Sequence, residues 1–466
     1  MGSNPIPSAI LTEDRCLPLS GRGFFFEVGT QVRYHIWTMG CQMNQADSAK
    51  LAAGLDRLGH KPVNSPEEAD LVVVNTCVVR EHAERRAVSK LGELKRLKAG
   101  RNGLKVVLTG CLVGPRTAEL QRRFPHVDVF APPQAFTDII AAIDRDDGAA
   151  CSPDFWTATF PSPAGPRPTA YMPVIHGCNK FCTYCIVPYR RGRERSRPMV
   201  ELHREVEHLV AGGVRDVTLL GQSVEAYGRD LTDTPDLPAG QADLADLMRD
   251  LHEIEGLERI RFLTSYPADV TDRIIDAVAE LPKVCECFSL PLQSGDDEVL
   301  ARMRRGYTAD EYRAVVERIR RRIPKSAITT DIIVGFCGET DEQFQHSYDL
   351  LEELRFDKVH VAAYSPRPGT IAARTMADDV PAEVKAARLQ AVESLEARIA
   401  GEINAGLTGS VQEVLVEGQR KGKWSGRARS DKLVHFTGNC RTGNVVSVRI
   451  EKTSPWSLQG NAIAEG

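Results

Sequence analysis

Apolar runs alternate with stretches of helical periodicity through the first third of the chain. The runs are short and nearly continuous, as in parallel strands that are buried on both faces of a sheet. Between them, apolar residues recur with the period of an amphipathic helix. This order predicts parallel βαβ units. The predicted strands are residues 32–37, 71–74, 105–108 and 128–130, and the predicted helices are residues 46–58, 80–98 and 136–145.

The same alternation returns after residue 170 and continues to about residue 400. Six consecutive βα units predict an open or partial (βα)6 barrel of the TIM type, in which active sites lie at the carboxyl ends of the strands. The predicted strands are residues 172–175, 217–220, 260–263, 288–292, 329–334 and 359–364, and helices at 199–211, 308–322 and 340–354 lie among them.

The carboxyl-terminal part of the chain has a different pattern. β-Branched runs at residues 411–416, 434–436 and 445–450 are separated by glycine-rich turns. This pattern predicts a small five-stranded barrel of the oligonucleotide-binding type. Basic residues beside Trp424 suit single-stranded RNA or an RNA loop, and the alternative is an ordinary β domain that caps the protein.

We therefore expect an α/β protein in several parts. The amino-terminal part is a Rossmann-like parallel α/β domain, and a proline-rich linker joins it to the barrel. The predicted divisions are an irregular leader at 1–31, the amino-terminal domain at 32–150, the linker at 151–169, the barrel at 170–403 and the small β domain at 404–466.

Composition indicates a globular protein in a reducing compartment. Hydrophobic residues make up 42% of the 466 residues, and no apolar run reaches the length of a membrane span. The first thirty residues lack the features of a signal peptide, so we expect a cytoplasmic protein. The net charge of -4 argues against general coating of nucleic acid. Twelve cysteines in so long a chain indicate metal binding rather than a disulfide scaffold.

Three of these cysteines, Cys178, Cys182 and Cys185, lie in one loop after the first predicted barrel strand. Thiolates are soft ligands that suit iron–sulfur clusters and zinc. Three ligands leave one metal position open, as a reactive site requires, whereas a zinc site would need a distant fourth ligand. The Cys-x3-Cys-x2-Cys spacing, with an aromatic residue before the last cysteine, resembles the radical S-adenosylmethionine (SAM) superfamily.

A second set of cysteines repeats at the ends of the first three strands. Cys41, Cys77 and Cys111 each follow a predicted strand, directly after a threonine or a glycine. Ligands of parallel sheets bind outside the carboxyl ends of the strands, so these thiols should converge on one rim. This repetition favours a second metal site with three ligands, and the alternative is three small buried side chains.

Small and polar residues at the other barrel strand ends could surround a cofactor. Any one of them could belong to an ordinary turn, but as a ring around one mouth they favour a SAM pocket. Tyr184 is a candidate for contact with the adenine. The other candidates are Gly221, Gln222, Ser265, Gln293, Ser294, Gly335, Glu339 and Tyr364.

Two basic segments are candidates for RNA contact. An arginine-rich run directly follows the Cys178 loop and suits recognition of phosphate or carboxylate groups, although such a run can also be a solvated face. The second segment lies in the small β domain. The candidate residues are Arg190, Arg191, Arg193, Arg195 and Arg197 in the first segment, and Lys423, Trp424, Arg427 and Arg429 in the second.

Longer motifs carry a resemblance to one family. Residues 40–44 (GCQMN), 75–81 (NTCVVRE) and 177–185 (GCNKFCTYC) resemble the radical SAM methylthiotransferases, and so do residues 304–308, 365–370 and 454–458. The resemblance extends from about residue 32 to the end and implies a cluster domain, a radical SAM barrel and a TRAM domain. Cys337, Ser223 and Tyr266 depart from the residues common at these positions, which are proline, asparagine and histidine.

The resemblance implies a reaction. Two 4Fe-4S clusters, held by the two cysteine sets, and two SAM molecules would add a methylthio group to C2 of N6-isopentenyladenosine at position 37 of tRNA. The sulfur would come from the cluster on Cys41, Cys77 and Cys111, and the electrons from a donor such as flavodoxin or ferredoxin. The chain would act as a monomer on the anticodon stem-loop. No role is assigned to Cys16, Cys151, Cys285, Cys287, Cys337 and Cys440.

Three alternatives remain at this point. The same chemistry could act on N6-threonylcarbamoyladenosine in tRNA or on an aspartate of a ribosomal protein. A non-catalytic iron–sulfur protein that binds RNA is the alternative from another class, and it predicts no cleavage of SAM on reduction.

Overall fold

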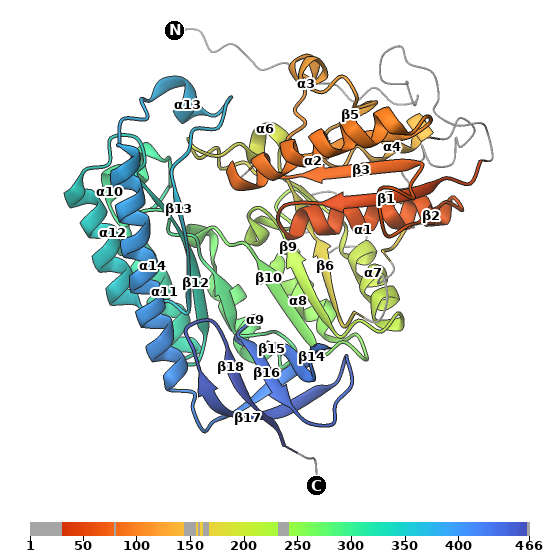
Figure 1. The fold of residues 1–466 in the computed structure, drawn as a ribbon. Helices are drawn as coiled ribbons and strands as arrows, with labels where there is room; N and C mark the ends of the chain where they lie inside the picture. Colours follow the sequence, from red (N-terminus) through yellow and green to blue (C-terminus); the bar gives the residue numbers. More distant parts are fainter. Residues whose placement is uncertain are drawn as a thin grey trace.

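The computed structural model describes residues 30–78, 81–143, 155–156, 159–161, 167–231 and 242–463. Cys16 and Cys151 lie outside these ranges. Figure 1 shows the amino-terminal sheet at the top, the central strands and their helices below it, and a small β-barrel at the bottom. The α/β fold expected from the sequence is confirmed.

The amino-terminal sheet has five parallel strands in the order β2-β1-β3-β4-β5. The central strand β3 is buried along its whole length, which explains its continuous apolar sequence. The strands are β1 (Arg33–Thr38), β2 (Lys61–Pro62), β3 (Leu71–Thr76), β4 (Lys105–Gly110) and β5 (Val129–Ala131), and the helices are α1 (Gln42–Arg57), α2 (Glu81–Gly100), α3 (Ala118–Arg123) and α4 (Phe136–Ile143).

The central part contains six parallel strands in two hydrogen-bonded sheets of three. A bridge between Ile260 and Val284 connects the sheets, so the six strands form a partial barrel as predicted. The first sheet contains β6 (Thr169–Pro173), β9 (Asp216–Leu220) and β10 (Arg259–Leu263), and the second contains β11 (Cys287–Ser289), β12 (Ala327–Val334) and β13 (Lys358–Ala363).

Helices cover the outside of the partial barrel, and several begin at the signals that their sequences predict. Thr308 and Glu311 form a capping box at the start of α11, and Thr340 and Gln343 form one at α12. The longer helices are α7 (Met199–Ala211), α8 (Leu244–His252), α9 (Asp272–Glu280), α11 (Ala309–Arg322), α12 (Asp341–Leu354) and α14 (Ala382–Ala405). The short elements are β7 (Ile175–His176), α6 (Val187–Arg191), β8 (Arg195–Ser196), η1 (Val224–Ala226), η2 (Pro267–Asp269), α10 (Asp297–Arg302) and α13 (Ile371–Thr375).

The carboxyl-terminal strands form a closed barrel in the order β14-β15-β16-β18-β17. Strands β15 and β18 have few β-branched residues and were missed by the pattern; they form because closure of the barrel supplies a partner on each side. The strands are β14 (Val411–Arg420), β15 (Lys423–Ala428), β16 (Leu433–Thr437), β17 (Val445–Thr453) and β18 (Leu458–Ala462).

The two outer parts contact opposite ends of the central barrel (Figure 1). Arg191 and Arg367, which both follow barrel strands, pair with Asp47 and Glu84 of the amino-terminal part. At the other end, Arg259 of β10 donates to the backbone of the small barrel. The amino-terminal sheet therefore lies at the mouth of the central barrel, and the small barrel lies at its base.

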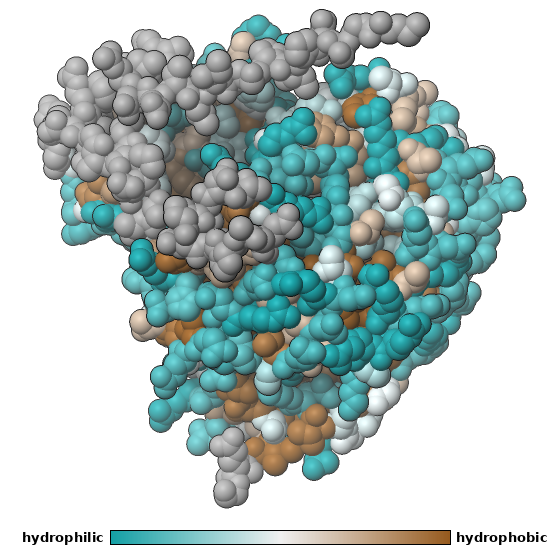
Figure 2. Space-filling model, turned by 180° about the vertical axis from the view of Figure 1, so that it is seen from behind, coloured by the Kyte–Doolittle hydropathy of each residue, from teal (hydrophilic) through white to brown (hydrophobic). Residues whose placement is uncertain are grey.

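The described surface is mostly polar. Figure 2 shows one face on which hydrophilic residues predominate and apolar areas are small and separate. No helix among the described residues is long and apolar enough to cross a membrane.

Candidate active site

The structure brings Cys41, Cys77 and Cys111 together, each directly or almost directly after the end of its strand. A hydrogen bond with Cys77 lowers the pKa of Cys41 to about 6. Cys111 is close enough to Cys41 for their charges to interact, and burial raises the pKa of Cys111. The three thiols thus share one rim of the sheet, as parallel strands require.

Two glycines make this arrangement possible. Gly40 has φ of 146°, and a Cβ there would lie 2.6 Å from Cβ of Cys77. Gly110 has φ of 90°, and a Cβ would lie 2.3 Å from the carbonyl oxygen of Thr76. A side chain at either position would be strained and would push neighbouring strand ends apart.

A pair of buried asparagines fixes the same strand ends. Nδ2 of Asn44 donates to Oδ1 of Asn75 at 2.8 Å, and Nδ2 of Asn75 donates to the Asn44 carbonyl at 2.9 Å. Oδ1 of Asn44 accepts a hydrogen bond from Sγ of Cys41 at 3.2 Å. The sequence motifs contain both asparagines, but the sequence analysis assigned them no role; their buried reciprocal bonds make them positioning residues.

The second set, Cys178, Cys182 and Cys185, lies in the loop between β7 and α6 at the barrel mouth. Burial raises the pKa of Cys178 to about 11 and that of Cys185 to about 12. The charge of Cys182 contributes to both shifts, so the three thiols lie close together. Burial of thiols disfavours free thiolates, and a bound cation would offset that cost.

Arg305 is a buried partner of this set to which the sequence analysis assigned no role beside the thiols. Its Nη1 donates to Sγ of Cys182 at 3.4 Å, and its Nη2 donates to the Pro291 carbonyl at 2.9 Å. The guanidinium also lies over the rings of Tyr266 and Tyr307. Arg305 therefore brings a fixed positive charge to the thiols. In the sequence, Arg302, Arg304 and Arg305 form one basic cluster, and nothing there distinguishes the buried arginine from its neighbours.

The loop after β9 presents buried polar atoms that have no hydrogen-bond partner in another residue. They are Oε1 of Gln222, Oγ of Ser223 and both carboxyl oxygens of Glu225. Burial raises the pKa of Glu225 well above its ordinary value. Buried polar atoms normally have partners, so this loop fits a polar ligand at the mouth. Gln222 was predicted here; Glu225 was missed because one acidic residue in a loop gives no signal.

Three of the predicted cofactor contacts, Ser294, Gly335 and Glu339, also make hydrogen bonds inside the protein. Oγ of Ser294 lies 3.3 Å from Oγ of Ser347 on α12. Oε2 of Glu339 accepts from Gly335 and from Nη1 of Arg388, at 2.6 Å and 2.8 Å. These contacts stabilise the loops after β11 and β12, while Oε1 of Glu339 is buried without a hydrogen-bond partner. Direct cofactor contact of Ser294, Gly335 and Glu339 stays a prediction.

The remaining predicted contacts stay near the mouth. Tyr184 packs edge-on against Phe336 with ring centroids 6.4 Å apart, and Phe336 packs against Tyr364 at 5.0 Å. Gly221 and Ser265 are buried at the ends of β9 and β10, and Gln293 follows β11 with φ of 75°. Gly221, Ser265, Gln293 and Tyr364 all follow barrel strands at their carboxyl ends, and the contacts of these residues and of Tyr184 with a cofactor stay a prediction.

The arginine run after the Cys178 loop divides into buried and exposed members. Arg191 pairs with Asp47, and a Cβ at Gly114 would lie 1.5 Å from Nη1 of Arg190, so both arginines pack against the amino-terminal part. Arg197 pairs with Glu201 and Glu205 of α7. The ion pairs leave the guanidinium groups of Arg191 and Arg197 less available to RNA than those of exposed arginines, and RNA contact stays a prediction for both.

Arg193 and Arg195 remain exposed beside the mouth. In the small barrel, Lys423 is exposed at the β14–β15 turn and Nε1 of Trp424 donates to the Gly438 carbonyl at 3.0 Å.

Two further arginines of the small barrel make internal contacts. Arg427 donates to the Asp431 carbonyl at 2.8 Å. Arg429 is committed to the junction with the central barrel, where it pairs with Glu286 at 2.8 Å and donates to the Pro282 and Val284 carbonyls. Each nitrogen group of the Arg429 guanidinium thus has a partner at this junction, and its RNA contact stays a prediction.

The metal-ligating side chains of the described residues are not arranged for a site that holds a single metal ion. In the ranges that the structure describes, no three His, Cys, Asp or Glu side chains are arranged to hold one metal ion. A 4Fe-4S cluster has a different requirement, since each thiolate binds its own iron. The described cysteines outside the two sets, Cys285, Cys287, Cys337 and Cys440, are free thiols.

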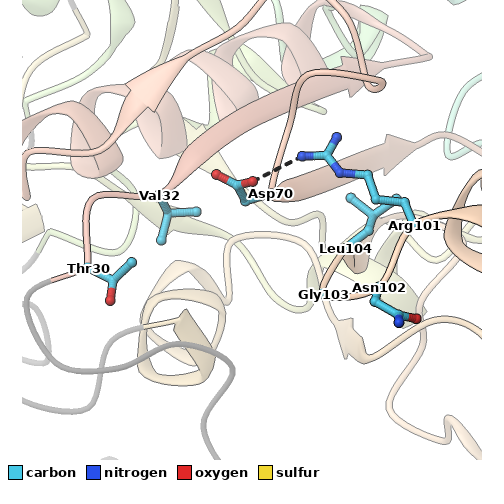
Figure 3. Close-up of a pocket in the computed structure, with 7 residues that line it drawn as sticks. All are labelled: Thr30, Val32, Asp70, Arg101, Asn102, Gly103 and Leu104. Carbon is cyan, nitrogen blue, oxygen red and sulfur yellow. Dashed lines mark hydrogen bonds and ion pairs between the residues drawn. The ribbon is translucent and has the colours of Figure 1, made fainter.

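A pocket of about 280 Å³ lies away from both cysteine sets. In Figure 3, Asp70 and Arg101 form an ion pair at 3.1 Å in its lining, and Thr30 and Val32 lie on the far side of Asp70 from Arg101. These residues precede β1, β3 and β4, so the pocket lies at the amino ends of the strands whose carboxyl ends carry the thiols. It is not part of the candidate active site.

Models of three families match consecutive parts of the chain. Residues 33–132 match the Uncharacterized protein family UPF0004, residues 172–351 match the Radical SAM superfamily, and residues 407–463 match the TRAM domain.

Among solved structures, two of the radical S-adenosylmethionine methyltransferase TsrM from Kitasatospora setae are similar in fold. Their TM-scores are 0.53 and 0.52 at 14% and 13% identity, and they cover 83% and 84% of this chain and 79% and 82% of theirs.

Curated relatives match nearly the whole chain. A tRNA-2-methylthio-N(6)-dimethylallyladenosine synthase from Dehalococcoides mccartyi (strain CBDB1) is 48% identical over 92% of this chain and 98% of its own. Proteins of the same name from Roseiflexus sp. (strain RS-1) and Dictyoglomus thermophilum are 46% and 44% identical, cover 92% and 93% of this chain, and are themselves covered to 89% and 99%. With this identity over this length, the chain belongs to the tRNA-2-methylthio-N(6)-dimethylallyladenosine synthase family of radical SAM proteins.

Proposed function

We propose that this protein is a tRNA methylthiotransferase that adds a methylthio group to C2 of N6-dimethylallyladenosine at position 37. The family supports the reaction and the substrate. The observation that carries the proposal is the presence of two cysteine sets at the two facing sites, one at the barrel mouth and one on the sheet above it. A protein that binds only one cluster would need only one such set of cysteines.

The family's cofactors are SAM and 4Fe-4S clusters. The donor atoms fit them, since each set offers three soft thiols and leaves a metal position open. Cys178, Cys182 and Cys185 would hold the radical SAM cluster, and the amino-terminal thiols would hold the second. When bound, these groups supply one-electron reduction, a 5′-deoxyadenosyl radical and the sulfur for transfer, which acid–base side chains cannot provide at an aromatic C–H.

The side chains of this protein would bind and orient SAM. The unpartnered oxygens of Gln222, Ser223 and Glu225 are hydrogen-bond acceptors that suit the amino group of SAM. Tyr184 and Tyr364 offer apolar ring faces to its adenosine. Burial of all these groups excludes water from the site, which protects a radical from quenching.

RNA binding would rest on exposed basic groups at two places. Arg193 and Arg195 lie beside the mouth, where a flipped adenine would enter, and Lys423 lies on the small barrel at the other end. Position 37 belongs to a loop, so extruding its base costs little. A flavodoxin- or ferredoxin-type protein would deliver electrons, and the chain would act as a monomer in the cytoplasm, where tRNA is processed.

Nucleoside mass spectrometry tests the proposal. The tRNA of a host that lacks the enzyme should gain 2-methylthio-N6-dimethylallyladenosine when this chain is expressed, while the unthiolated precursor declines. Cys178→Ala should abolish both SAM cleavage and product. Cys77→Ala should retain SAM cleavage and lose product. If the Cys77 variant made product, the assignment of the amino-terminal thiols would be wrong.

A further inference from the structure

Arg191 lies in one part of the protein and inserts its side chain into another. It is the last residue of α6, which begins two residues after Cys185. Its Nη2 lies 2.8 Å from Oδ2 of Asp47 on α1, and the two side chains are 2% and 6% exposed. A barrel residue that directly follows the radical SAM loop is thus buried within the amino-terminal part.

The surroundings of Arg191 are the thiols of the amino-terminal set. Its guanidinium lies close enough to both Cys41 and Cys111 for their charges to interact. Asp47 balances that charge through Nη2, and the guanidinium also interacts with the Cys111 thiol as a hydrogen-bond donor. The buried Nη1 still lacks an acceptor with full hydrogen-bond geometry. Buried guanidinium nitrogens normally donate to an acceptor, so Nη1 is aimed at a site where an acceptor belongs.

We propose that Arg191 is a positioning residue for the second cluster, in which Asp47 fixes the guanidinium and Nη1 donates a hydrogen bond to a sulfur of that cluster. The inference rests on the proposed function only in that a cluster occupies the Cys41, Cys77 and Cys111 thiols. Hydrogen bonds and positive charge next to a cluster stabilise its more reduced, more negative form. The barrel would thereby supply one residue of the amino-terminal site and raise the reduction potential of the cluster bound there.

The proposal has a structural consequence. Cys185 and Arg191 belong to one short segment, so the segment that shapes the radical SAM loop also shapes the sulfur-donating site. Any shift of α6 would therefore displace residues at both cysteine sites. The two sites are therefore held in register by residues 185–191 and not only by the packing of the sheet on the barrel.

The test uses the full chain with Cys178, Cys182 and Cys185 replaced by alanine, so that one cluster remains. Arg191→Gln, Arg191→Lys and Asp47→Asn are added singly, with Arg96→Gln as the control because it removes the same charge from the exposed side of α2. Each variant is reconstituted with iron and sulfide without oxygen. Iron and sulfide per chain are measured, and the midpoint potential is determined by redox titration.

We expect Arg191→Gln to shift the midpoint potential to more negative values, and Arg191→Lys, which keeps the charge, to restore part of the shift. Arg96→Gln should match the parent. Equal potentials for Arg191→Gln and Arg96→Gln would overturn the proposal. If Arg191→Gln loses the cluster, the potentials of Arg191→Lys and Asp47→Asn decide, and parent-like values for both would also overturn it.

These readouts need no tRNA, so they separate the inference from the proposed function. A shifted potential in a protein that yields no methylthio product would leave the positioning role standing and refute the function. A parent chain that binds no cluster at these thiols would refute the inference itself.

Discussion

Replacing Arg305 with glutamine removes a buried positive charge beside Cys182. The guanidinium makes three kinds of contact at once: Nη1 to Sγ of Cys182, Nε to the Tyr307 hydroxyl, and Nη2 to the Pro291 carbonyl. Glutamine can reach few of these positions and carries no charge. The substitution therefore weakens the stabilisation of the thiolate that the radical SAM cluster requires.

The size of the expected loss in cluster affinity can be worked out from the distance between Arg305 and Cys182. Two unit charges 3.4 Å apart attract by about 5 kcal/mol at an effective dielectric constant of about 20. The net effect is smaller, since the guanidinium spreads its charge and a bound thiolate shares its own with iron. Outer-shell partners of metal ligands typically contribute roughly 10- to 100-fold in affinity, or about 1.4 to 2.7 kcal/mol. We expect a loss of that size in cluster affinity.

The assay is retention of iron against a chelator in a chain with Cys41, Cys77 and Cys111 replaced by alanine, followed by 5′-deoxyadenosine production from SAM. Arg304→Gln is the matched control, because Arg304 is the exposed neighbour of Arg305 in the same loop. Arg305→Lys keeps the charge and should fall between Arg305→Gln and the parent. Circular dichroism checks folding. Equal iron retention in Arg305→Gln and Arg304→Gln would refute the reasoning.

Further predictions concern other parts of the molecule. Asp216→Asn should lower the stability of the junction with the small barrel by up to about 3–5 kcal/mol, because it removes the buried carboxylate that lies 2.8 Å from Nε of Arg261. The buried guanidinium then keeps only two backbone carbonyls and the longer, half-exposed contact with Asp431 at 3.8 Å. Hydrogen exchange in residues 411–463 measures this, and the double variant with Arg261→Met should lose less than the sum of the single losses. In the metal-free chain at pH 7, iodoacetamide should alkylate Cys41 well before Cys178, because pKa values of about 6 and 11 make the first mostly thiolate and the second mostly thiol. Below about pH 6 the rate at Cys41 should decline as the thiolate is protonated; similar rates at pH 7 would contradict the assignment. Gly110→Ala should impair loading of the second cluster while SAM cleavage continues, with iron content and 5′-deoxyadenosine as the two readouts.

Much of the fold could be predicted because its signals are local. Apolar runs and helical periodicity located the six strands of the partial barrel and the strands of the amino-terminal sheet except the two-residue β2. A cysteine soon after each of three strands implied a shared rim. These features depend on a few neighbouring residues and on the direction of parallel strands. Strands β15 and β18 were missed, since their residues become strands only when a closed barrel gives each two partners.

The sequence by itself determined which thiols form the two sets, because the spacing of the cysteines and their positions after predicted strands are properties of the sequence. Only the tertiary structure decided the roles of the charged residues around them. Arg191 and Arg193 look alike in one arginine-rich run, yet one is buried against Asp47 and the other is exposed. Arg305 and Glu225 gain their importance from burial beside groups far away in sequence. The energy of a charge depends on the solvent and partners around it, and packing alone supplies those.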